Sequence, residues 1–344
     1  MDKKIINLDE FIPHCLTEYT INLEVVEKLK KLFNSKNLVN LIFHGVNGSG
    51  KYTLVLALLS YIYDNTVYSK KKNEIVLEEK HSKKTQTIEV YSSSYHYELD
   101  AIEYSMNENN LICLFINNIC KNYNINNKYH IILIKNAQVL SKNNQIQLKG
   151  IIEKYYSTCR LILLFNKISG VDLYLKSQFL EIRVPLPKKS EICELAYKII
   201  NDYNVPFTID DFKKLIKYVS CDLYKLTFKM QQIIINGGYI EDMDYIEKKL
   251  KDLIKLIKKK CILENKLIKI REELLQILLN NYPPTLMFEY IISGFSKEKN
   301  YTSEQKMQII HYGAEFELRC CEGYRQLYHI EAFIAKIILI IESY

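Results

Sequence analysis

The sequence lacks the paired cysteine spacings that mark zinc sites and disulfide frameworks. Its nine cysteines include the adjacent pair Cys320 and Cys321, and several others lie in apolar runs such as Leu111–Phe115. We therefore expect buried free thiols in a reducing compartment, and neither disulfides nor a metal centre.

A long apolar run is also missing. Met1–Glu10 is polar apart from a brief apolar pair, which argues against a signal peptide. The longest late apolar run, Phe333–Ile341, is interrupted by Lys336 and is too short to span a bilayer. We expect a soluble intracellular protein with no membrane partner.

The charge balance is not strongly biased to one sign. A formal net charge of +7 is a mild excess for 344 residues, so it permits binding to a polyanion without requiring it. A solvated lysine surface explains it equally well. The composition, 48% hydrophobic and 25% charged, is typical of a soluble globular protein, and the length allows two or three domains.

The first half of the chain alternates strand-like and helix-like segments. The strand-like segments are short apolar runs at Leu38–His44, Ile88–Tyr91, Tyr129–Ile134, Arg160–Phe165 and Leu180–Val184. Helical patterns occupy Thr53–Tyr63 and Asn143–Tyr156, and the polar stretch from Lys70 to Lys84 is typical of an exposed hairpin or loop. Strands separated by helices indicate an α/β fold with a parallel sheet.

Pro185 and Pro187 end this pattern, and the remaining chain is predicted to be helical. Three helices are expected first, at Ser190–Asn201, Asp210–Ser220 and Leu223–Asn236, and Gly237 and Gly238 close the last of them. More helices follow, with a turn at Pro283–Pro284 and a polar loop at Ser296–Thr302.

No internal repeat or low-complexity tract is present. We therefore expect three domains in the order of an α/β domain at residues 1–187, a small helical lid at 188–240 and an all-helical domain at 241–344.

Residues 45–53 read GVNGSGKYT, which contains the GxxxxGK pattern of a phosphate-binding P-loop. Glycines let backbone N–H groups fold around a phosphate, and the start of the following helix favours negative charge. A glycine-rich turn that meets no nucleotide is the alternative, but the preceding strand and following helix disfavour it. The candidate nucleotide-binding residues here are Gly45, Val46, Asn47, Gly48, Ser49, Gly50, Lys51, Tyr52 and Thr53.

Two parts of a hydrolytic site are replaced. The residue after the P-loop lysine, normally a Ser or Thr that ligates Mg²⁺, is Tyr52, and Thr53 lies one residue too late. The apolar strand Ile131–Ile134 is followed by Lys135 and Asn136, where carboxylates would hold the metal and orient water. These replacements argue against magnesium binding and against ATP hydrolysis.

Several motifs resemble those of one protein family. EKYYSTCR at Glu153–Arg160, followed by LILLFN and by IRVPLP at Ile182–Pro187, resembles the small subunits of eukaryotic-type clamp loaders. LYHIEAFIAK at Leu327–Lys336 resembles the collar helix of subunit three of replication factor C, and SYHYEL at Ser94–Leu99 and the GKYT variant of the P-loop point the same way. The chain is thus similar to the replication factor C small subunits, an AAA+ family.

This resemblance implies an AAA+ P-loop domain with a parallel sheet, a helical lid and a C-terminal helical collar that serves oligomerisation. It implies ATP or ADP as the bound nucleotide, and other clamp-loader subunits in a hetero-pentamer, a ring-shaped sliding clamp and primer–template DNA as partners. The implied location is the nucleus, or a viral replication compartment if the genome is viral.

The resemblance also assigns two further nucleotide-site residues. Asn166 matches sensor 1, and Lys225 falls near the sensor-2 arginine of the lid, where it keeps the charge but loses the fork geometry. The plain alternatives are that Asn166 caps a strand end and that Lys225 is solvated.

Two family motifs are altered. The Ser-Arg-Cys motif, whose arginine reaches the neighbouring subunit's nucleotide, appears as Ser177, Gln178 and Phe179, so it offers no arginine finger. The Tyr-Arg-Pro motif of the adenine site reads Phe11, Ile12 and Pro13, which keeps a pocket wall without its arginine.

DNA contacts in this family go through lysines, arginines and helix N-termini to phosphates. The candidates here are Lys80, Lys83, Lys84 and Lys149, with Lys154 beside the last, and a solvated basic face is the default alternative. The basic stretch Lys248–Lys260 is amphipathic, and we expect it to pack on sister subunits.

The sequence thus predicts a small clamp-loader subunit for replication and repair that hydrolyses ATP weakly or not at all. One alternative is an adaptor in a related checkpoint clamp loader. Another is an active ATPase in which acids such as Asp100 or Glu103 have replaced the lost carboxylates, although no spacing supports it. A linked hypothesis is that Lys51, Lys135 and Lys225 bind nucleotide without magnesium, against the alternative that Lys135 points to solvent.

Overall fold

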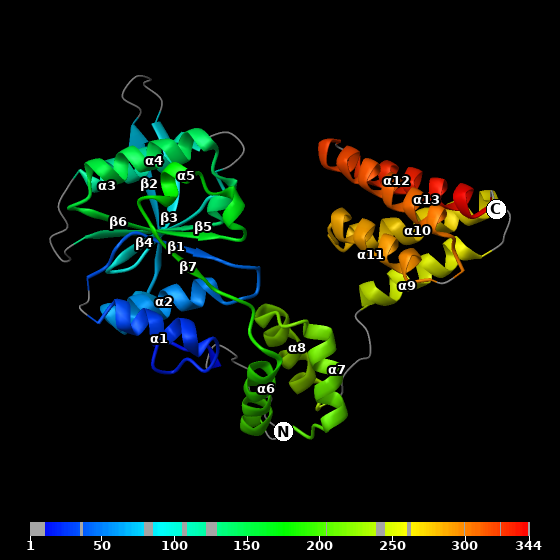
Figure 1. Ribbon diagram of the computed structural model, residues 1–344, viewed down its shortest axis with the longest axis horizontal. Helices are drawn as coiled ribbons and strands as arrows, with labels where there is room; N and C mark the ends of the chain where they lie inside the picture. Colours follow the sequence, from blue (N-terminus) through cyan, green and yellow to red (C-terminus); the bar gives the residue numbers. More distant parts are fainter. Residues whose placement is uncertain are drawn as a thin grey trace. The chain divides into compact units, whose positions relative to one another are not determined.

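The computed structural model describes residues 11–34, 37–78, 85–104, 109–121, 129–203, 205–238, 245–259, 263–298, 300–323 and 325–342. The chain divides into two compact units, residues 1–240 and residues 241–344 (Figure 1). Each unit has its own hydrophobic core.

A seven-stranded sheet in the order β2-β3-β4-β5-β6-β1-β7 lies at the centre of the described part of the first unit. Its strands are β1 (Leu41–His44), β2 (Lys71–Glu78), β3 (Thr85–Ser92), β4 (His96–Asp100), β5 (His130–Lys135), β6 (Cys159–Phe165) and β7 (Leu180–Arg183). Strands β4, β5, β6, β1 and β7 pair in parallel, which confirms the expected α/β fold for the centre of the sheet.

The edge strands β2 and β3 pair antiparallel, so the sheet is mixed and not purely parallel. The connection between Glu78 and Thr85 has too few residues to form the crossover that a parallel pair of strands needs. The stretch expected to be an exposed hairpin or loop therefore contributes β2, which pairs with β3 in the sheet. The DNA-contact candidates Lys80, Lys83 and Lys84 lie outside the described residues.

Helices cover both faces of the sheet (Figure 1). Helices α1 (Leu23–Leu32) and α2 (Lys51–Ile62) share a core with Ile131 and Leu133 of β5. Helices α3 (Asn109–Cys120), α4 (Lys142–Lys154) and α5 (Leu173–Lys176) share the opposite core with Ile132 and Ile134 of the same strand. Since successive strand residues point to opposite faces, an apolar run like this one is buried on both sides.

The lid part of the first unit consists of α6 (Lys189–Tyr203), α7 (Ile209–Val219) and α8 (Leu223–Ile235), around a small core of their own. Helix α7 begins with a capping box between Thr208 and Asp211. The chain leaves α8 through Gly237 and Gly238, with φ angles of 66° and 100°, which glycine adopts without steric cost.

The second unit contains α9 (Tyr245–Lys258), α10 (Leu263–Leu279), α11 (Pro284–Ser296), α12 (Ser303–Glu322) and α13 (Gln326–Glu342). The apolar face of α9, with Leu250, Leu253 and Ile257, is buried in the core that these helices share. The expectation that the Lys248–Lys260 stretch packs on sister subunits is therefore wrong for its apolar side, because that side is covered within this chain.

The cysteines in the described part of the chain are free thiols, and Cys113, Cys120, Cys159 and Cys320 are buried. Over the same residues, no cluster of His, Cys, Asp and Glu side chains is arranged to hold a metal ion. No helix in the described ranges has the length and apolar character that crossing a bilayer requires.

Candidate nucleotide-binding site

A cavity of about 1080 Å³ lies beside the start of α2 in the first unit. Four parts of the unit line it: the N-terminal segment, the P-loop, the ends of β5 and β6, and the lid. The lining residues that carry the argument below are Phe11, Ile12, Pro13, Asn47, Gly48, Gly50, Lys51, Tyr52, Thr53, Lys135, Asn136, Asn166, Asp222, Leu223 and Tyr224.

The P-loop conformation depends on its glycines. Gly48 and Gly50 have φ angles of 77° and 81°, in the left-handed region. A Cβ atom at Gly45 would lie 2.1 Å from the Val184 carbonyl oxygen, and one at Gly48 would lie 2.0 Å from the Asp222 carboxylate. The loop thus passes close to both β7 and the lid, which only glycine permits.

Lys51 is held inside the loop. Its Nζ donates to the carbonyl oxygens of Gly45 at 2.6 Å and Val46 at 2.9 Å, and the residue is only 9% exposed. This burial lowers the pKa of Lys51 from its ordinary value. Because Gly50 provides no side-chain cap, the first N–H groups of α2 are free of side-chain capping and can meet an anion.

The lid rests directly on this loop. The backbone N–H of Leu223, the first residue of α8, donates to the Gly48 carbonyl oxygen at 2.9 Å. The Asp222 carboxylate accepts from the N–H groups of Tyr224 and Lys225 and so caps α8. The hydrogen bonds to Asp222 therefore cap the lid helix, and the neighbouring bond from Leu223 seats the start of that helix against the P-loop.

The predicted nucleotide residues fall into two groups. Asn47, Gly48, Gly50, Lys51, Tyr52, Thr53 and Asn166 line the cavity. Gly45, Val46, Ser49 and Lys225 do not: the first two serve Lys51 through their carbonyls, Ser49 is buried, and Lys225 is exposed on α8. Phe11, Ile12 and Pro13 line the cavity, so the altered adenine motif still forms a wall.

Gln178 of the altered arginine-finger motif and the DNA-contact candidate Lys149 lie outside the cavity. The Gln178 amide donates to Glu153 at 3.3 Å. Lys149 on α4 pairs with the same glutamate at 3.6 Å, and its ammonium lies 5.5 Å from the centre of the Tyr174 ring. Neither residue lines the cavity.

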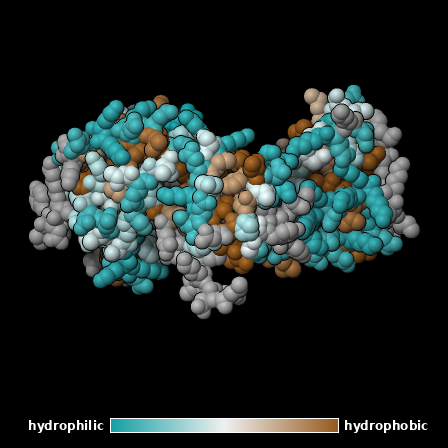
Figure 2. Space-filling model, turned by 90° about the horizontal axis from the view of Figure 1, so that it is seen from below, coloured by the Kyte–Doolittle hydropathy of each residue, from teal (hydrophilic) through white to brown (hydrophobic). Residues whose placement is uncertain are grey.

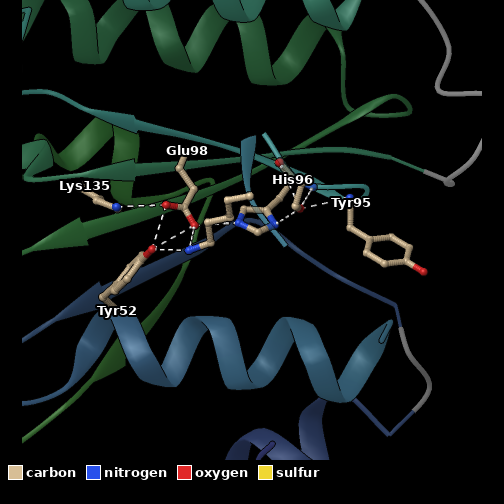
Figure 3. A network of polar contacts seen from close by, with 7 residues as sticks. Tyr52, Tyr95, His96, Glu98 and Lys135 are labelled. Carbon is tan, nitrogen blue, oxygen red and sulfur yellow. Dashed lines mark hydrogen bonds and ion pairs between the residues drawn. The ribbon is translucent and has the colours of Figure 1, made fainter. Parts of the chain in front are cut away.

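Glu98 on β4 lies at the centre of a polar network behind the P-loop (Figure 3). The residue is 2% exposed. Its Oε1 atom contacts Lys70 at 2.6 Å and His96 Nε2 at 2.8 Å, while Oε2 accepts from the Tyr52 hydroxyl at 2.9 Å and pairs with Lys135 at 3.0 Å. Two lysines, a histidine and a phenol therefore surround one buried carboxylate.

Burial alone would raise the pKa of Glu98, but hydrogen bonds from His96 and Lys70 and the charge of Lys135 hold that pKa well below its ordinary range. Burial, and then the charge of Glu98, raise the pKa of Tyr52 above its ordinary value. Tyr52 is thus a neutral hydrogen-bonding phenol in this site.

Glu98, Lys70 and His96 were not among the residues predicted from the sequence. The detectable signal was the alternation of His96 and Glu98 within Ser94–Leu99, which places both side chains on one face of a strand. What the sequence does not show is that this face meets the first turn of α2, which contains Tyr52.

The acids proposed as displaced catalytic groups are not at the cavity. Asn136 donates through its amide to both oxygens of Asp100, at 2.9 Å and 3.0 Å, and Asp100 does not line the cavity. Glu103 is exposed and is also absent from the lining.

Comparison with known proteins supports the resemblance seen in the motifs. A family model described as the C-terminal domain of replication factor C subunit 3 matches residues 247–344. Replication factor C subunit 3 of Arabidopsis thaliana is 26% identical over 349 residues, covering 98% of each chain. The probable subunit 3 of Dictyostelium discoideum is 27% identical, covering 98% of this chain and 99% of that protein, and subunit 5 of Saccharomyces cerevisiae is 25% identical, covering 96% and 98%.

Among solved structures, a mutant of Thermotoga maritima RuvB aligns with a TM-score of 0.50 at 11% identity, covering 74% of this chain and 82% of that one. At this identity the likeness concerns the fold alone. The similarity in sequence extends over nearly the whole chain and includes the matched C-terminal domain, so the chain is similar to replication factor C subunits 3 and 5 along nearly all of its length.

Proposed function

We propose that this chain is a small subunit of a DNA sliding-clamp loader that holds ATP or ADP in its P-loop cavity and hydrolyses it weakly or not at all. Its partners are the other subunits of a hetero-pentamer, the ring-shaped clamp and primer–template DNA, in replication and repair. Its place is the nucleus, or a viral replication compartment if the gene is viral.

The observation that carries the proposal is the chemistry at the metal and water positions. Tyr52 and Lys135 stand where the family places metal ligands, and both are bound to Glu98. The Asn136 amide, at the position of a catalytic base, donates its hydrogens to Asp100. An amide cannot accept the proton of an attacking water, and an ammonium cannot ligate a cation.

The second unit supports the assembly part of the proposal. Several of its large apolar side chains are exposed, among them Leu279, Met307 and Leu318 at 80%, 73% and 60%. Figure 2 shows hydrophobic residues between the hydrophilic ones on one face of the molecule. Apolar side chains that the chain's own core does not cover are suited to contacts with sister subunits in a collar.

The hydrolysis test uses the purified chain and its Lys51→Ala variant. We expect no steady-state phosphate release above background, and no difference between the two proteins. Phosphate release by the chain that disappears in Lys51→Ala would overturn the proposal of a non-hydrolysing subunit.

The assembly test uses co-expression with other clamp-loader subunits and size-exclusion chromatography. The full chain should enter a pentamer, whereas a chain without residues 241–344 should not. A pentamer that survives this deletion counts against a collar role, and the large subunit that co-purifies identifies a replication or a checkpoint loader.

A further inference from the structure

The Glu98 network engages Tyr52 and Lys135, the two residues at the sequence positions where metal ligands are expected. Both oxygens of Glu98 are already in contact with donors, namely Lys70, His96, Tyr52 and Lys135. The Tyr52 hydroxyl in turn accepts a hydrogen bond from Lys70. Magnesium requires free oxygen ligands in near-octahedral geometry, and the side chains at this wall do not provide them.

The same wall is already positively charged. The Lys70 and Lys135 ammonium groups lie 4.8 Å and 4.2 Å from the centre of the Tyr52 ring. Such contacts with an aromatic ring stabilise a cation, and two ammonium groups repel a metal ion at this range. The residues present therefore do not fit magnesium.

Lys135 differs from Lys70 in what it faces. Its side chain is 28% exposed against 18% for Lys70, and it lines the cavity together with Lys51, whereas Lys70 does not. Lys135 can thus keep its ion pair with Glu98 and still present its charge to a phosphate chain in the cavity.

His96 completes the support of Glu98. The Ser93 hydroxyl lies 2.7 Å from Nδ1 of His96, and Nε2 of the same ring lies 2.8 Å from Glu98. The ring is fully buried, so His96 gives the carboxylate a rigid contact in addition to Tyr52 and the two flexible lysines.

We propose that the phosphate groups of a nucleoside diphosphate bind in this cavity without a divalent metal, with the Lys135 ammonium in place of the cation and with Glu98 as the positioning residue that holds Lys135 there. The inference rests on the nucleotide-holding role proposed above and deepens it. Glu98 acts through Lys135 and does not touch the nucleotide.

The first measurement is the affinity of the full chain for fluorescent ADP in EDTA and in excess magnesium. We expect dissociation constants that agree within about twofold, because no ligand set gains from the metal. Affinity about tenfold tighter in magnesium, a gain of one metal–phosphate interaction, would overturn the inference.

The second measurement is a double-mutant cycle in EDTA with Glu98→Gln, Lys135→Met and both together. Glu98→Gln keeps the side-chain shape but leaves Lys70 and Lys135 without a counter-charge, so the more exposed Lys135 turns to water. We expect ADP binding to weaken about fivefold in each single variant, and the double variant to be no weaker than Lys135→Met alone. Glu89→Gln is the control, since Glu89 pairs with Lys72 at 2.6 Å and is 49% exposed.

Two outcomes of the cycle contradict the role of Glu98. One is unchanged or tighter ADP binding in Glu98→Gln. The other is that adding Glu98→Gln to the Lys135→Met variant weakens ADP binding as much as it does in the wild type, which would mean general damage to the site. If Glu98→Gln does not fold, the Lys135→Met variant alone tests the inference. An ADP affinity of Lys135→Met in EDTA equal to that of the wild type then overturns the inference. Absence of ADP binding in both conditions also overturns it, yet leaves subunit assembly and the lack of hydrolysis intact.

Discussion

At the scale of single residues, Gly48 joins the P-loop to the lid. Its φ of 77° costs a residue with a side chain about 1–2 kcal/mol, and a Cβ atom would also collide with Asp222. We expect Gly48→Ala to lower the free energy of unfolding of the first unit by at least that amount and to weaken ADP binding.

Gly150 offers a matched control for this substitution. It lies within α4, and a Cβ there would have no neighbour within 4 Å. Gly150→Ala should therefore stabilise the protein by about 0.5–1 kcal/mol through helix propensity. Urea unfolding compares the two variants, and equal stability of Gly48→Ala and wild type would refute the strain argument.

Glu98 makes the stability depend on pH in a defined direction. Since the pKa of its carboxyl is lowered in the folded protein, Glu98 contributes stability that is fully present above the ordinary pKa of about 4.3 and is lost as the pH falls toward the folded value. We expect Glu98→Gln to be clearly less stable than wild type at pH 7. The difference in free energy of unfolding between the two proteins should narrow below the ordinary carboxyl pKa. Chemical unfolding across this pH window measures it, and a gap that stays constant contradicts the assignment.

At the scale of elements, the N-terminal caps of two lid helices differ in whether they also contact the P-loop. Asp222 caps α8 and lies against Gly48, whereas Thr208 caps α7 in the same lid. Replacing either by Ala should cost about 1 kcal/mol of stability. Only Asp222→Ala should speed hydrogen exchange at the Leu223 amide, which donates to Gly48. Equal exchange in the two variants would show that the cap does not hold the lid on the loop.

The elements that the sequence predicted well were those with a single, strong local pattern. The apolar runs of β1, β5 and β6 are buried between two layers of helices, so their composition alone marks them, whereas the edge strand β7 is mostly exposed. Helices α1 and α3 and strand β4 were not identified, and β2 was expected only as part of an exposed hairpin or loop. Strand β2 begins with four polar residues, Lys71 to Glu74, at a sheet edge, where the signal is weak and pairing with β3 decides the conformation.

At the scale of the whole molecule, the two units have separate cores, so damage to one should spare the other. Phe333 of α13 is fully buried, with its ring centre 5.2 Å from that of Phe288 and 6.4 Å from that of Phe316. Phe333→Ala should cost about 3–5 kcal/mol and abolish pentamer assembly. ADP binding by the first unit should remain as in wild type.

The exposed Leu279→Ala variant is the control for the stability loss alone, because a surface substitution should shift the free energy of unfolding by less than about 0.5 kcal/mol. It is not a control for assembly, since Leu279 is one of the proposed contacts with sister subunits. Thermal unfolding, size-exclusion chromatography with partner subunits and ADP titration read out the three effects. Loss of ADP binding in Phe333→Ala would show that the units depend on each other.

The sequence by itself determined the P-loop pattern, the presence of Tyr52, Lys135 and Asn136 where hydrolytic groups are expected, the helical character of the C-terminal half and the resemblance to replication factor C small subunits. All of these follow from local patterns or from residue identity at one position. The tertiary structure alone decided that Glu98 ties Tyr52 to Lys135, that Asn136 is bound to Asp100, and that Asp222 rests on Gly48 while Lys225 lies outside the cavity. Such contacts join residues far apart in the chain, and their geometry arises only when sheet, P-loop and lid pack together.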